Sequence, residues 1–496
     1  MIEKVVVLGS GSAGLLAALT LKRKLPQLEV EIVRDPDIGI IGVGEGSTPN
    51  LVSHLFNYVG IKRKRFYELA KPTWKLGIRF KWGPRGSFNY TFDQQLDQEF
   101  NELKAPNGFF CRESFSQASV SSCLMDEGKA FIRKPNGSPF IQGGHSFHIE
   151  NEHLVECLES EAVASRVRIT EGKMTGAERG DNGIEAIHLS DGRRIDADLF
   201  VDASGFRGEL IGKVLEEPFV SFDKTLFCDR AVVGGWERGD EPILPYTTAE
   251  QMDSGWCWQI EHEQHINRGY VFSSDMISDE QAFEEFRRKN PKVPDTPRFV
   301  PFTAGHRRRP WVDNVFSVGN AAGFVEPLEA TALMVICSQC KALATMIQQS
   351  TLELSSTMRD MYNGLQQKEW SLIRDFLGLH YKFNTAVDTP FWKRCREETD
   401  LSGIQDVLDF YEENGPSVLI RHLLPDFVND FGVEGFLVML VGNKAPCRKQ
   451  YEPDSKQTRK WQQRCAFLAK QAKSGVDVKQ ALGFVRDPRW DWAEGK

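Results

Sequence analysis

The sequence predicts an α/β fold with a parallel sheet near the N-terminus and a helical C-terminal region. The chain begins with a short β-branched run, Val5–Leu8, that leads through a glycine-rich turn into a good helix former. A second apolar run, Asn314–Val318, ends in another turn of small residues and is again followed by a helical pattern. The remainder, Ser350–Lys496, is mainly helical in pattern. These observations predict a Rossmann-type domain that carries an inserted mixed β-sheet and ends in helices.

The first turn, GSGSAG, has the spacing of a dinucleotide-binding fingerprint. Gly9 permits the turn, Gly11 lets backbone N–H groups approach a pyrophosphate, and Gly14 lets the helix pack on the strand. Ser12 and Ala13 open the helix, whose N-terminal N–H donors attract phosphate. Because the motif follows a β run directly, we predict that these five residues bind a dinucleotide, rather than form a turn without a ligand.

The next segments supply further candidates for cofactor binding. After the first helix, a second strand ends at Arg34 and Asp35. Many dinucleotide folds place an acid here to bind the ribose hydroxyls, although in this chain the basic residue comes first. The loop Ile41–Pro49 is rich in glycine, but no full strand precedes it at the right distance. We therefore expect Gly44 and Gly46 to belong to a loop that passes close to a ligand.

Length, composition and charge set the class of protein. A chain of 496 residues is too long for one core, so two or three interleaved domains are expected. The net charge is 61 minus 69, or −8, which gives no electrostatic argument for binding nucleic acid or an anionic membrane. No signal peptide is visible, and no apolar run approaches the roughly 18 residues of a membrane span. We expect a cytoplasmic protein.

The cysteines and the one compact polar cluster do not predict a metal site. Cys337 and Cys340 lie in an apolar helical stretch, where core thiols are expected rather than metal ligands or a redox pair. Glu261, His262 and Glu263 form a turn-rich cluster without spaced partners. We expect that cluster to be exposed and solvated.

The middle of the chain predicts a substrate-side sheet inserted into the cofactor domain. Leu76, Ile78 and Phe80 alternate with glycine or basic residues, as in a strand. Lys75 stands at the start of this strand beside Trp74. We divide the chain into a cofactor domain over residues 1–350, interleaved with the sheet at about 75–150 and 216–300, and a mainly helical region over 351–496.

Alternating aromatic residues mark the candidate walls of a substrate pocket. Phe88, Tyr90 and Phe92 fall on one face of a strand. Trp256 and Trp258 alternate in the same way along a later strand. We predict that all five contribute to the pocket, and for the two tryptophans a place in the core is a serious alternative.

The second turn joins a strand to a long apolar helix that we expect to end near Gln348. A strand, a small-residue turn and a helix N-terminus form a site for an anion or a flavin. The candidates for flavin binding here are Gly319, Asn320, Gly323, Pro327 and Leu333.

Taken together, these motifs resemble one family, the flavin-dependent tryptophan halogenases. The blocks that carry the resemblance follow the family's order and are GSGSAG at Gly9–Gly14, IGVGEGSTP at Ile41–Pro49, the segment around Lys75, GWCWQI at Gly255–Ile260 and RRPWVDNVFSVGNAAGFVEPLEATAL at Arg308–Leu333. His380-Tyr381 with Asp388–Trp392 adds a weaker match. Two blocks depart from the family: Glu261 replaces the proline of WxWxIP, and PLESTG reads PLEATA at Pro327–Ala332.

The resemblance implies roles for four residues. Lys75 would meet hypohalous acid as a hydrogen-bond donor or become a haloamine, and a flexible ammonium suits that task, whereas most lysines are simply solvated. Glu329 would orient the electrophile or take the ring proton, although an acid that favours the helix dipole fits the same position. Thr331 and Ala332 would offer backbone N–H groups to halide.

The implied function is that of an FADH2-dependent halogenase, which makes hypohalous acid from O2 and chloride or bromide and halogenates an indole-type ring through Lys75. A separate NAD(P)H-dependent flavin reductase is implied, because only one fingerprint is visible, and a homodimer is compatible. Two alternatives stay open, an FAD-dependent aromatic hydroxylase and a flavin-binding protein without turnover. Because the C-terminal region is short, we expect indole, a simple derivative or an indole held on a larger partner to be preferred over free tryptophan.

Overall fold

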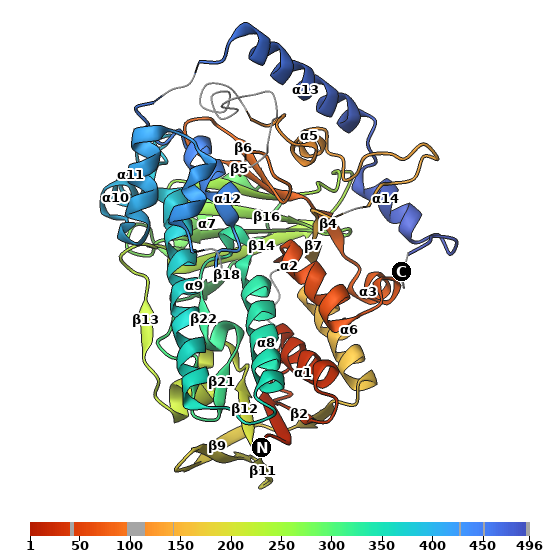
Figure 1. Cartoon of the computed structure of the whole chain (residues 1–496), viewed down its shortest axis with the longest axis vertical. Coiled ribbons are helices and arrows are strands. Elements are labelled where there is room, and N and C mark those ends of the chain that lie inside the picture. The colour runs from red at the N-terminus through yellow and green to blue at the C-terminus, as the bar shows by residue number, and fades with distance from the viewer. Residues whose placement is uncertain (40–43, 97–114, 142, 426–427, 450–451, 493–496) are drawn as a thin grey trace.

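The computed structural model describes residues 1–39, 44–96, 115–141, 143–425, 428–449 and 452–492. Figure 1 shows two sheets stacked along the long axis, with the N-terminal sheet at one end and a larger sheet toward the other. The long helices α8 (Thr331–Gln349) and α9 (Ser356–Lys382) run along this axis beside them. The chain therefore has an α/β fold with an inserted mixed sheet and a helical C-terminal region.

The N-terminal sheet is built around β1, which lies between β2 and β12. Its six strands, in spatial order, are β20 (Trp311–Val312), β21 (Val315–Ser317), β12 (Leu199–Asp202), β1 (Lys4–Leu8), β2 (Glu29–Arg34) and β8 (Arg168–Glu171). All neighbours pair in parallel except β20 and β21. The chain leaves β1 toward β2 on one side and later returns to β12 on the other, so the carboxyl end of β1 is a topological switch point.

The second sheet is mixed and draws its strands from two distant parts of the chain. In spatial order they are β18 (Arg298–Pro301), β14 (Arg230–Glu237), β17 (His265–Phe272), β16 (Gly255–Glu261), β15 (Thr247–Met252), β5 (Gly77–Lys81) and β6 (Phe88–Thr91). Only β15 and β5 pair in parallel, and this pair joins the early segment to the late one.

Three short sheets complete the β structure. One joins β3 (Glu45–Gly46), β7 (Ser146–Ile149) and β4 (Thr73–Lys75). The others are β11 (Arg194–Asp196), β10 (Gly183–Leu189) and β9 (Met174–Gly180), and β13 (Phe219–Ser221), β19 (Gly305–Arg307) and β22 (Gly323–Phe324). Because β4 and β5 are separated by one residue but belong to different sheets, Leu76 lies at the junction of two sheets.

The helices fall into an N-terminal group and a C-terminal group. The first comprises α1 (Ser12–Lys24), α2 (Pro49–Val52), α3 (Arg63–Ala70), α5 (Val120–Asp126), α6 (Asn151–Ala164) and α7 (Asp279–Lys289). After α8 and α9 follow α10 (Pro390–Glu398), α11 (Gln405–Asn414), α12 (Gly432–Gly442), α13 (Ser455–Lys473) and α14 (Val478–Val485). The mainly helical C-terminal region is thus as predicted.

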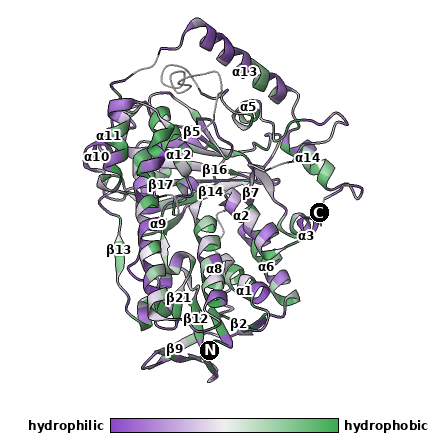
Figure 2. Ribbon diagram, viewed as in Figure 1, coloured by the Kyte–Doolittle hydropathy of each residue, from purple (hydrophilic) through white to green (hydrophobic). Residues whose placement is uncertain are grey.

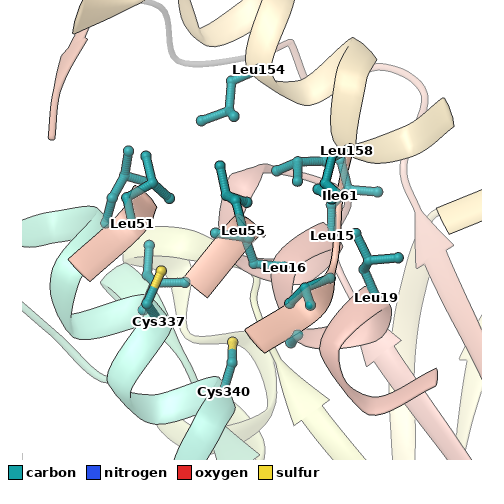
Figure 3. Packing of buried hydrophobic residues seen from close by; sticks show 14 of the residues in the cluster. Leu15, Leu16, Leu19, Leu51, Leu55, Ile61, Leu154, Leu158, Cys337 and Cys340 are labelled. Atoms are coloured by element: carbon teal, nitrogen blue, oxygen red, sulfur yellow. The ribbon is translucent and has the colours of Figure 1, made fainter. Parts of the chain in front are cut away.

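Helices α1, α6 and α8 pack together on the N-terminal sheet. Figure 3 shows Leu15 and Leu19 of α1 facing Leu158 of α6, with Cys337 and Cys340 of α8 close by. Both thiols are buried and free, as the sequence predicts. Figure 2 shows hydrophobic (green) stretches along both α1 and α8.

Helix α8 is long and apolar enough, by length and composition alone, to cross a membrane. It is the one candidate span within the described residues, and 61% of its 18-residue window is buried inside the protein. A core helix has this burial, because its apolar residues face other elements rather than lipid. The expectation that no apolar stretch approaches such a length was therefore too strong, since α8 extends over 19 residues.

One expectation about exposure is wrong. Glu261 and His262 are only 1% and 4% exposed, where a solvated cluster was predicted. Glu261 forms an ion pair with Arg238 at 2.5 Å, and His262 Nε2 lies 3.1 Å from the side-chain amide of Asn267. Glu261 ends β16 inside the second sheet, so the sheet buries a carboxylate that local sequence suggested would face water.

Candidate functional site

The fingerprint turn lies at the switch point of the N-terminal sheet. Gly9 has φ +113°, a conformation that glycine adopts without strain. A Cβ at Gly14 would stand 2.0 Å from the carbonyl oxygen of Gly9, so only glycine lets α1 approach the turn this closely. Gly11 is the N-cap of α1, and a Cβ there would meet no atom within 4 Å. The space in front of Gly11, together with the free N–H groups of the first helical turn, fits a pyrophosphate.

The second turn lies against the first. Gly319 has φ +61°, and a Cβ there would stand 2.8 Å from the Cβ of Ala13. Its N–H donates to Oε1 of Gln339 at 2.9 Å, and the side-chain amide of Gln339 donates to Gln366 at 3.2 Å. The two turns predicted to bind cofactor, 310 residues apart in sequence, therefore form one surface, and a buried amide chain holds the second of them.

The remaining cofactor candidates lie along the same region. Arg34 ends β2 and pairs with Glu159 and Glu171, each at 2.9 Å. Asp35 follows it, and its carboxylate accepts the N–H of Asp37 at 3.0 Å in a local turn. Asn320 lies within the short helix η4 (Gly319–Ala321), and Gly323 begins β22. Pro327 begins η5 (Pro327–Glu329), and Leu333 lies in the first turn of α8.

Lys75 ends β4, directly before the junction of the two sheets. It pairs with Ser146 across β7, and the next residue, Leu76, donates its N–H to the carbonyl of Pro245 at 2.7 Å. Its neighbour Trp74 is fully buried and donates to the hydroxyl of Tyr67 at 2.8 Å. The lysine side chain therefore enters the interior between two sheets, because backbone pairing fixes β4 on one side and the chain continues into β5 on the other.

The Lys75 ammonium is buried without a hydrogen-bonded acceptor. Its side chain is 0% exposed, and Nζ has no hydrogen-bond partner among the residues that the structure describes. Burial lowers its pKa to about 8, and the charge of Glu329 opposes that shift. Nζ lies 5.4 Å from the ring centre of Phe92. Lys75 is therefore not the solvated surface lysine that the sequence left as an alternative. An unpaired buried ammonium costs free energy.

Glu329 is held by a histidine from the far end of α9. Its Oε1 lies 2.6 Å from Nε2 of His380, and both side chains are at most 3% exposed. Nδ1 of His380 lies 2.8 Å from the carbonyl oxygen of Phe376, which only accepts, so Nδ1 carries a hydrogen. The other nitrogen and the carboxylate consequently share one proton between them. Glu329 precedes α8 in η5, and its closest interaction is with this imidazole.

The glycine-rich loop packs against Lys75. A Cβ at Gly46 would stand 3.3 Å from Nζ of Lys75, 3.3 Å from Oγ1 of Thr247 and 3.6 Å from Cβ of Ala330. Thr247 Oγ1 lies 2.9 Å from Nε2 of His148, whose pKa is lowered well below its ordinary value, first by burial and then by Lys75. Gly44 has φ +70° and adjoins His262. Residues 40–43 of the loop lie outside the described part.

The N-terminus of α8 lies near Lys75, because Ala330 and the Lys75 side chain both approach Gly46. Ala330, its N-cap, has φ +55°, a left-handed conformation uncommon for a residue with a Cβ. Thr331 is buried and Ala332 is exposed. The first N–H groups of a helix have no partner within it, so they are suited to an anion.

Of the three alternating aromatic residues in and after β6, Phe88 packs in the core, and Tyr90 and Phe92 lie near Glu329 and Lys75. Phe88 is 5% exposed and stacks on Phe80 with ring centres 5.2 Å apart. Tyr90 lies close enough to Glu329 for that charge, after burial itself, to raise the tyrosine pKa. Phe92 follows β6, donates its N–H to Leu76 and contacts Lys75. The Lys75 contact therefore belongs to Phe92, and Phe88 packs as a core residue.

The two tryptophans of β16 are buried. Trp256 and Trp258 are 1% and 4% exposed, with ring centres 6.2 Å apart. Trp256 Nε1 lies 3.4 Å from Glu326, which also accepts the hydroxyl of Tyr381 at 2.6 Å. Burial raises the pKa of Glu326 to about 7. Both indoles pack as core residues do, which agrees with the core role stated from the sequence as the alternative to a pocket role.

Sequence reasoning missed several side chains that complete the site. His380, Glu326 and Gln339 were not predicted, although His380 and Tyr381 stood in the weakest of the matching blocks. Their partners lie 20 to 70 residues away in sequence, which local patterns do not reveal. Within the described residues no group of three or more His, Cys, Asp or Glu side chains is placed to hold a metal ion.

Comparison with known proteins gives consistent matches over most of the chain. A family model described as tryptophan halogenase matches residues 4–456. The chain is 30% identical over 439 residues to the tryptophan 7-halogenase RebH of Lentzea aerocolonigenes, covering 83% of this chain and 82% of RebH. It is 30% identical to the tryptophan 6-halogenase ThaL of Streptomyces albogriseolus, covering 84% and 83% of the two chains.

Solved structures agree with these matches. MibH, a lanthipeptide tryptophan 5-halogenase, superposes with a TM-score of 0.88 at 35% identity, over 98% of this chain and 94% of MibH. BrvH, a flavin-dependent halogenase from Brevundimonas sp. BAL3, superposes with a TM-score of 0.85 at 25% identity, over 97% and 99% of the two chains. An aromatic hydroxylase and an inert flavoprotein are not favoured by any of these matches. The chain belongs to the family of flavin-dependent tryptophan halogenases, enzymes that use FAD and halide.

Proposed function

We propose that Lys75 delivers electrophilic halogen to an indole that is carried on a polypeptide rather than to free tryptophan. The observation that carries the catalytic part is the buried Nζ of Lys75, which has no acceptor among the described residues and interacts electrostatically with Glu329. An ammonium in that state is available to a ligand that comes within hydrogen-bond distance of it.

FAD is proposed to lie along the two turns, with the pyrophosphate at Gly11. The residues proposed to hold it are Gly9, Gly11, Ser12, Ala13, Gly14, Arg34, Asp35, Gly44, Gly46, Gly319, Asn320, Gly323, Pro327 and Leu333. The bound reduced flavin supplies the electrons that activate O2 toward halide. Thr331 and Ala332 are proposed to bind that halide through N–H groups at the start of α8, where the helix dipole favours an anion.

The proposed step at Lys75 follows from its pKa. Because burial lowers the pKa of Lys75 to about 8, a part of the side chains is neutral near neutral pH. The neutral amine attacks the halogen of hypohalous acid to form an N–halogen bond and releases water after proton transfer; the ammonium form instead donates a hydrogen bond to the same acid. The haloamine, or the hypohalous acid hydrogen-bonded to the ammonium, then gives the halogen to a ring carbon; the ring proton leaves, and the second route releases water.

Glu329 is proposed to accept the proton that leaves the halogenated ring carbon. Its carboxylate already shares one proton with Nε2 of His380. The imidazole cannot turn its other nitrogen toward the carboxylate without losing the bond to Phe376. His380 is thus proposed as a positioning residue, which orients Glu329 and balances its charge.

The polypeptide-borne substrate is supported by the surroundings of the candidate pocket. Helix α12 packs near Tyr90 and carries one charged residue, Glu434. That carboxylate accepts the backbone N–H groups of Gln95 and Leu96, at 2.9 and 3.0 Å. The ammonium and carboxylate of free tryptophan would each need a partner to be buried, whereas an indole within a peptide presents neither. The relative at 35% identity, MibH, is itself a lanthipeptide tryptophan halogenase.

The experiment compares three substrates in one reductase-coupled assay. Values of kcat/KM are measured for indole, for free tryptophan and for an N-acetylated, C-amidated peptide with a central tryptophan, in bromide and in chloride, with products identified by mass spectrometry. We expect the peptide and indole to exceed free tryptophan at least tenfold. A preference for free tryptophan contradicts the proposal, and would mean that residues of the C-terminal region supply the charge partners.

Four further features are proposed. A separate NAD(P)H-dependent reductase supplies the reduced flavin, because the sequence has one fingerprint, and the enzyme works in the cytoplasm. The chain divides into a cofactor domain with the interleaved sheet and a helical region after residue 350. A homodimer stays a prediction, which light scattering after size-exclusion chromatography tests.

A further inference from the structure

Helix α13 concentrates positive charge in a chain that is acidic overall. It contains six lysines or arginines and no aspartate or glutamate, whereas the whole chain has a net charge of −8. Lys456, Arg459, Lys470 and Lys473 are exposed. At 1.5 Å per residue, the 19-residue helix presents these charges over roughly 28 Å. Figure 2 colours α13 largely as hydrophilic.

One part of this helix combines the charge with an exposed aromatic ring. Phe467 is 60% exposed, more than any other aromatic side chain among the described residues. It lies on one face with Lys470, Gln471 and Ser474, because positions three, four and seven apart are neighbours on a helix. These residues line a surface hollow of about 520 Å³ together with Lys473. For Lys470 and Lys473 no ion pair is found among the described residues.

The other face of α13 connects directly to the surroundings of Lys75. Leu468 and Ala472 are buried in a cluster with Leu124 of α5 and with Leu76, the residue that follows Lys75. Figure 1 shows α13 beside α5, at the opposite end of the molecule from the N-terminal sheet. The helix therefore belongs to the substrate side of the fold and lies far from the fingerprint turn.

We propose that this face of α13 docks an acidic segment of the polypeptide that carries the indole. Carboxylates of the segment pair with Lys470 and Lys473, and one of its apolar side chains rests against Phe467. The proposal rests on the proposed function, because it assumes a polypeptide substrate. A peptide is favoured over an anionic membrane because the helix packs on the cluster that contains Leu76, the residue next to Lys75.

Binding is tested separately from catalysis. The probe is a fluorescein-labelled peptide with four glutamates around one phenylalanine and no tryptophan, and its counterpart has glutamine in place of glutamate. Fluorescence anisotropy with the FAD-loaded full chain is expected to give about fivefold tighter binding of the acidic peptide, the effect of two exposed ion pairs, and to lose that difference in 0.5 M salt.

The variants carry matched changes of charge. Lys470→Glu with Lys473→Glu is expected to abolish the preference for the acidic peptide, and the milder Lys470→Gln with Lys473→Gln to reduce it. Lys62→Glu with Lys224→Glu, two exposed lysines outside α13, changes the net charge equally and is expected to keep the preference. Melting temperature and FAD content verify that each variant is folded. Equal binding of both peptides, or no effect of the α13 variants, overturns the proposal.

Two further arms separate this proposal from the proposed function. Tryptophan peptides with a glutamate tail and with a glutamine tail are compared in the halogenation assay, and the glutamate tail is expected to raise kcat/KM about fivefold. Equal kcat/KM values for the two tails overturn the docking proposal and leave the polypeptide substrate standing. Binding of the acidic probe without halogenation of either peptide overturns the proposal that the substrate is a polypeptide. Co-sedimentation with phosphatidylserine vesicles, without binding of the acidic probe, would replace the peptide by a membrane surface.

Discussion

Replacing Lys75 by methionine is expected to abolish halogenation and, at neutral pH, to stabilise the protein. Methionine keeps the length and removes the charge from a fully buried position. Burial lowers the lysine pKa from 10.5 to about 8, which corresponds to about 3 kcal/mol of unfavourable free energy for the charged form in the folded state. FAD is expected to stay bound, since Lys75 lies outside both glycine turns.

The sign of the pH dependence follows from the lowered pKa. Above pH 10.5 lysine is neutral in both states and the penalty vanishes; between pH 10.5 and 8 the unfolded chain binds the proton and the folded chain does not, so stability falls as the pH falls. Below pH 8 the penalty is constant. The stability advantage of Lys75→Met over the parent chain is therefore expected to be complete at pH 7 and absent near pH 10.5.

The size of the effect can be converted to a melting temperature. A chain of 496 residues has an unfolding entropy of about 1 kcal/mol/K, so 3 kcal/mol corresponds to about 3 °C. Differential scanning calorimetry of FAD-loaded protein at pH 7 and pH 10, with Lys62→Met as the exposed control, makes the measurement. A Lys75→Met protein that halogenates at a normal rate refutes the catalytic role. One that is less stable at pH 7 refutes the argument from burial.

Three further substitutions test the rest of the site. Gly11→Val is expected to remove the visible flavin spectrum after desalting, because the added side chain meets no protein atom and fills only the space proposed for pyrophosphate; Gly176→Val, at an equally open position, is expected to keep it. His380→Phe is expected to lower kcat at least tenfold with little change in KM, because Glu329 loses its partner, and unchanged kcat would exclude a positioning role. Gln339→Leu removes one hydrogen bond to the second turn and is expected to weaken FAD binding by up to about tenfold, measured by equilibrium titration.

Local patterns predicted the parts of the fold that local physics determines. The helix after the fingerprint extends over Ser12–Lys24, and the apolar helix after the second turn extends over Thr331–Gln349. Both follow small-residue turns that end buried strands, so strand, turn and helix are encoded within about 20 residues.

The long-range pairings were beyond local patterns. The parallel pair of β5 and β15 brings Ile78 beside Thr247, and no local signal specifies which strand segment completes such a sheet. The contact between Glu329 and His380 spans 51 residues and depends on how α9 packs beside α8. The role of Lys75 could therefore be suspected from the sequence, whereas the residues that surround it could be identified only from the fold.

The buried charges of Glu261 and Lys75 differ in whether they have a partner, and not in how deeply they are buried. Glu261 and Lys75 are both at most 1% exposed, and both occur where sheet strands end. Glu261 is compensated by Arg238 at 2.5 Å and by a side-chain amide, so the second sheet gains a fixed internal contact and the charge remains where it is. Lys75 has an aromatic ring at 5.4 Å and a carboxylate already engaged with an imidazole. A buried charge without its own partner lowers stability, and a fold retains such a group most readily where a ligand supplies the missing contact.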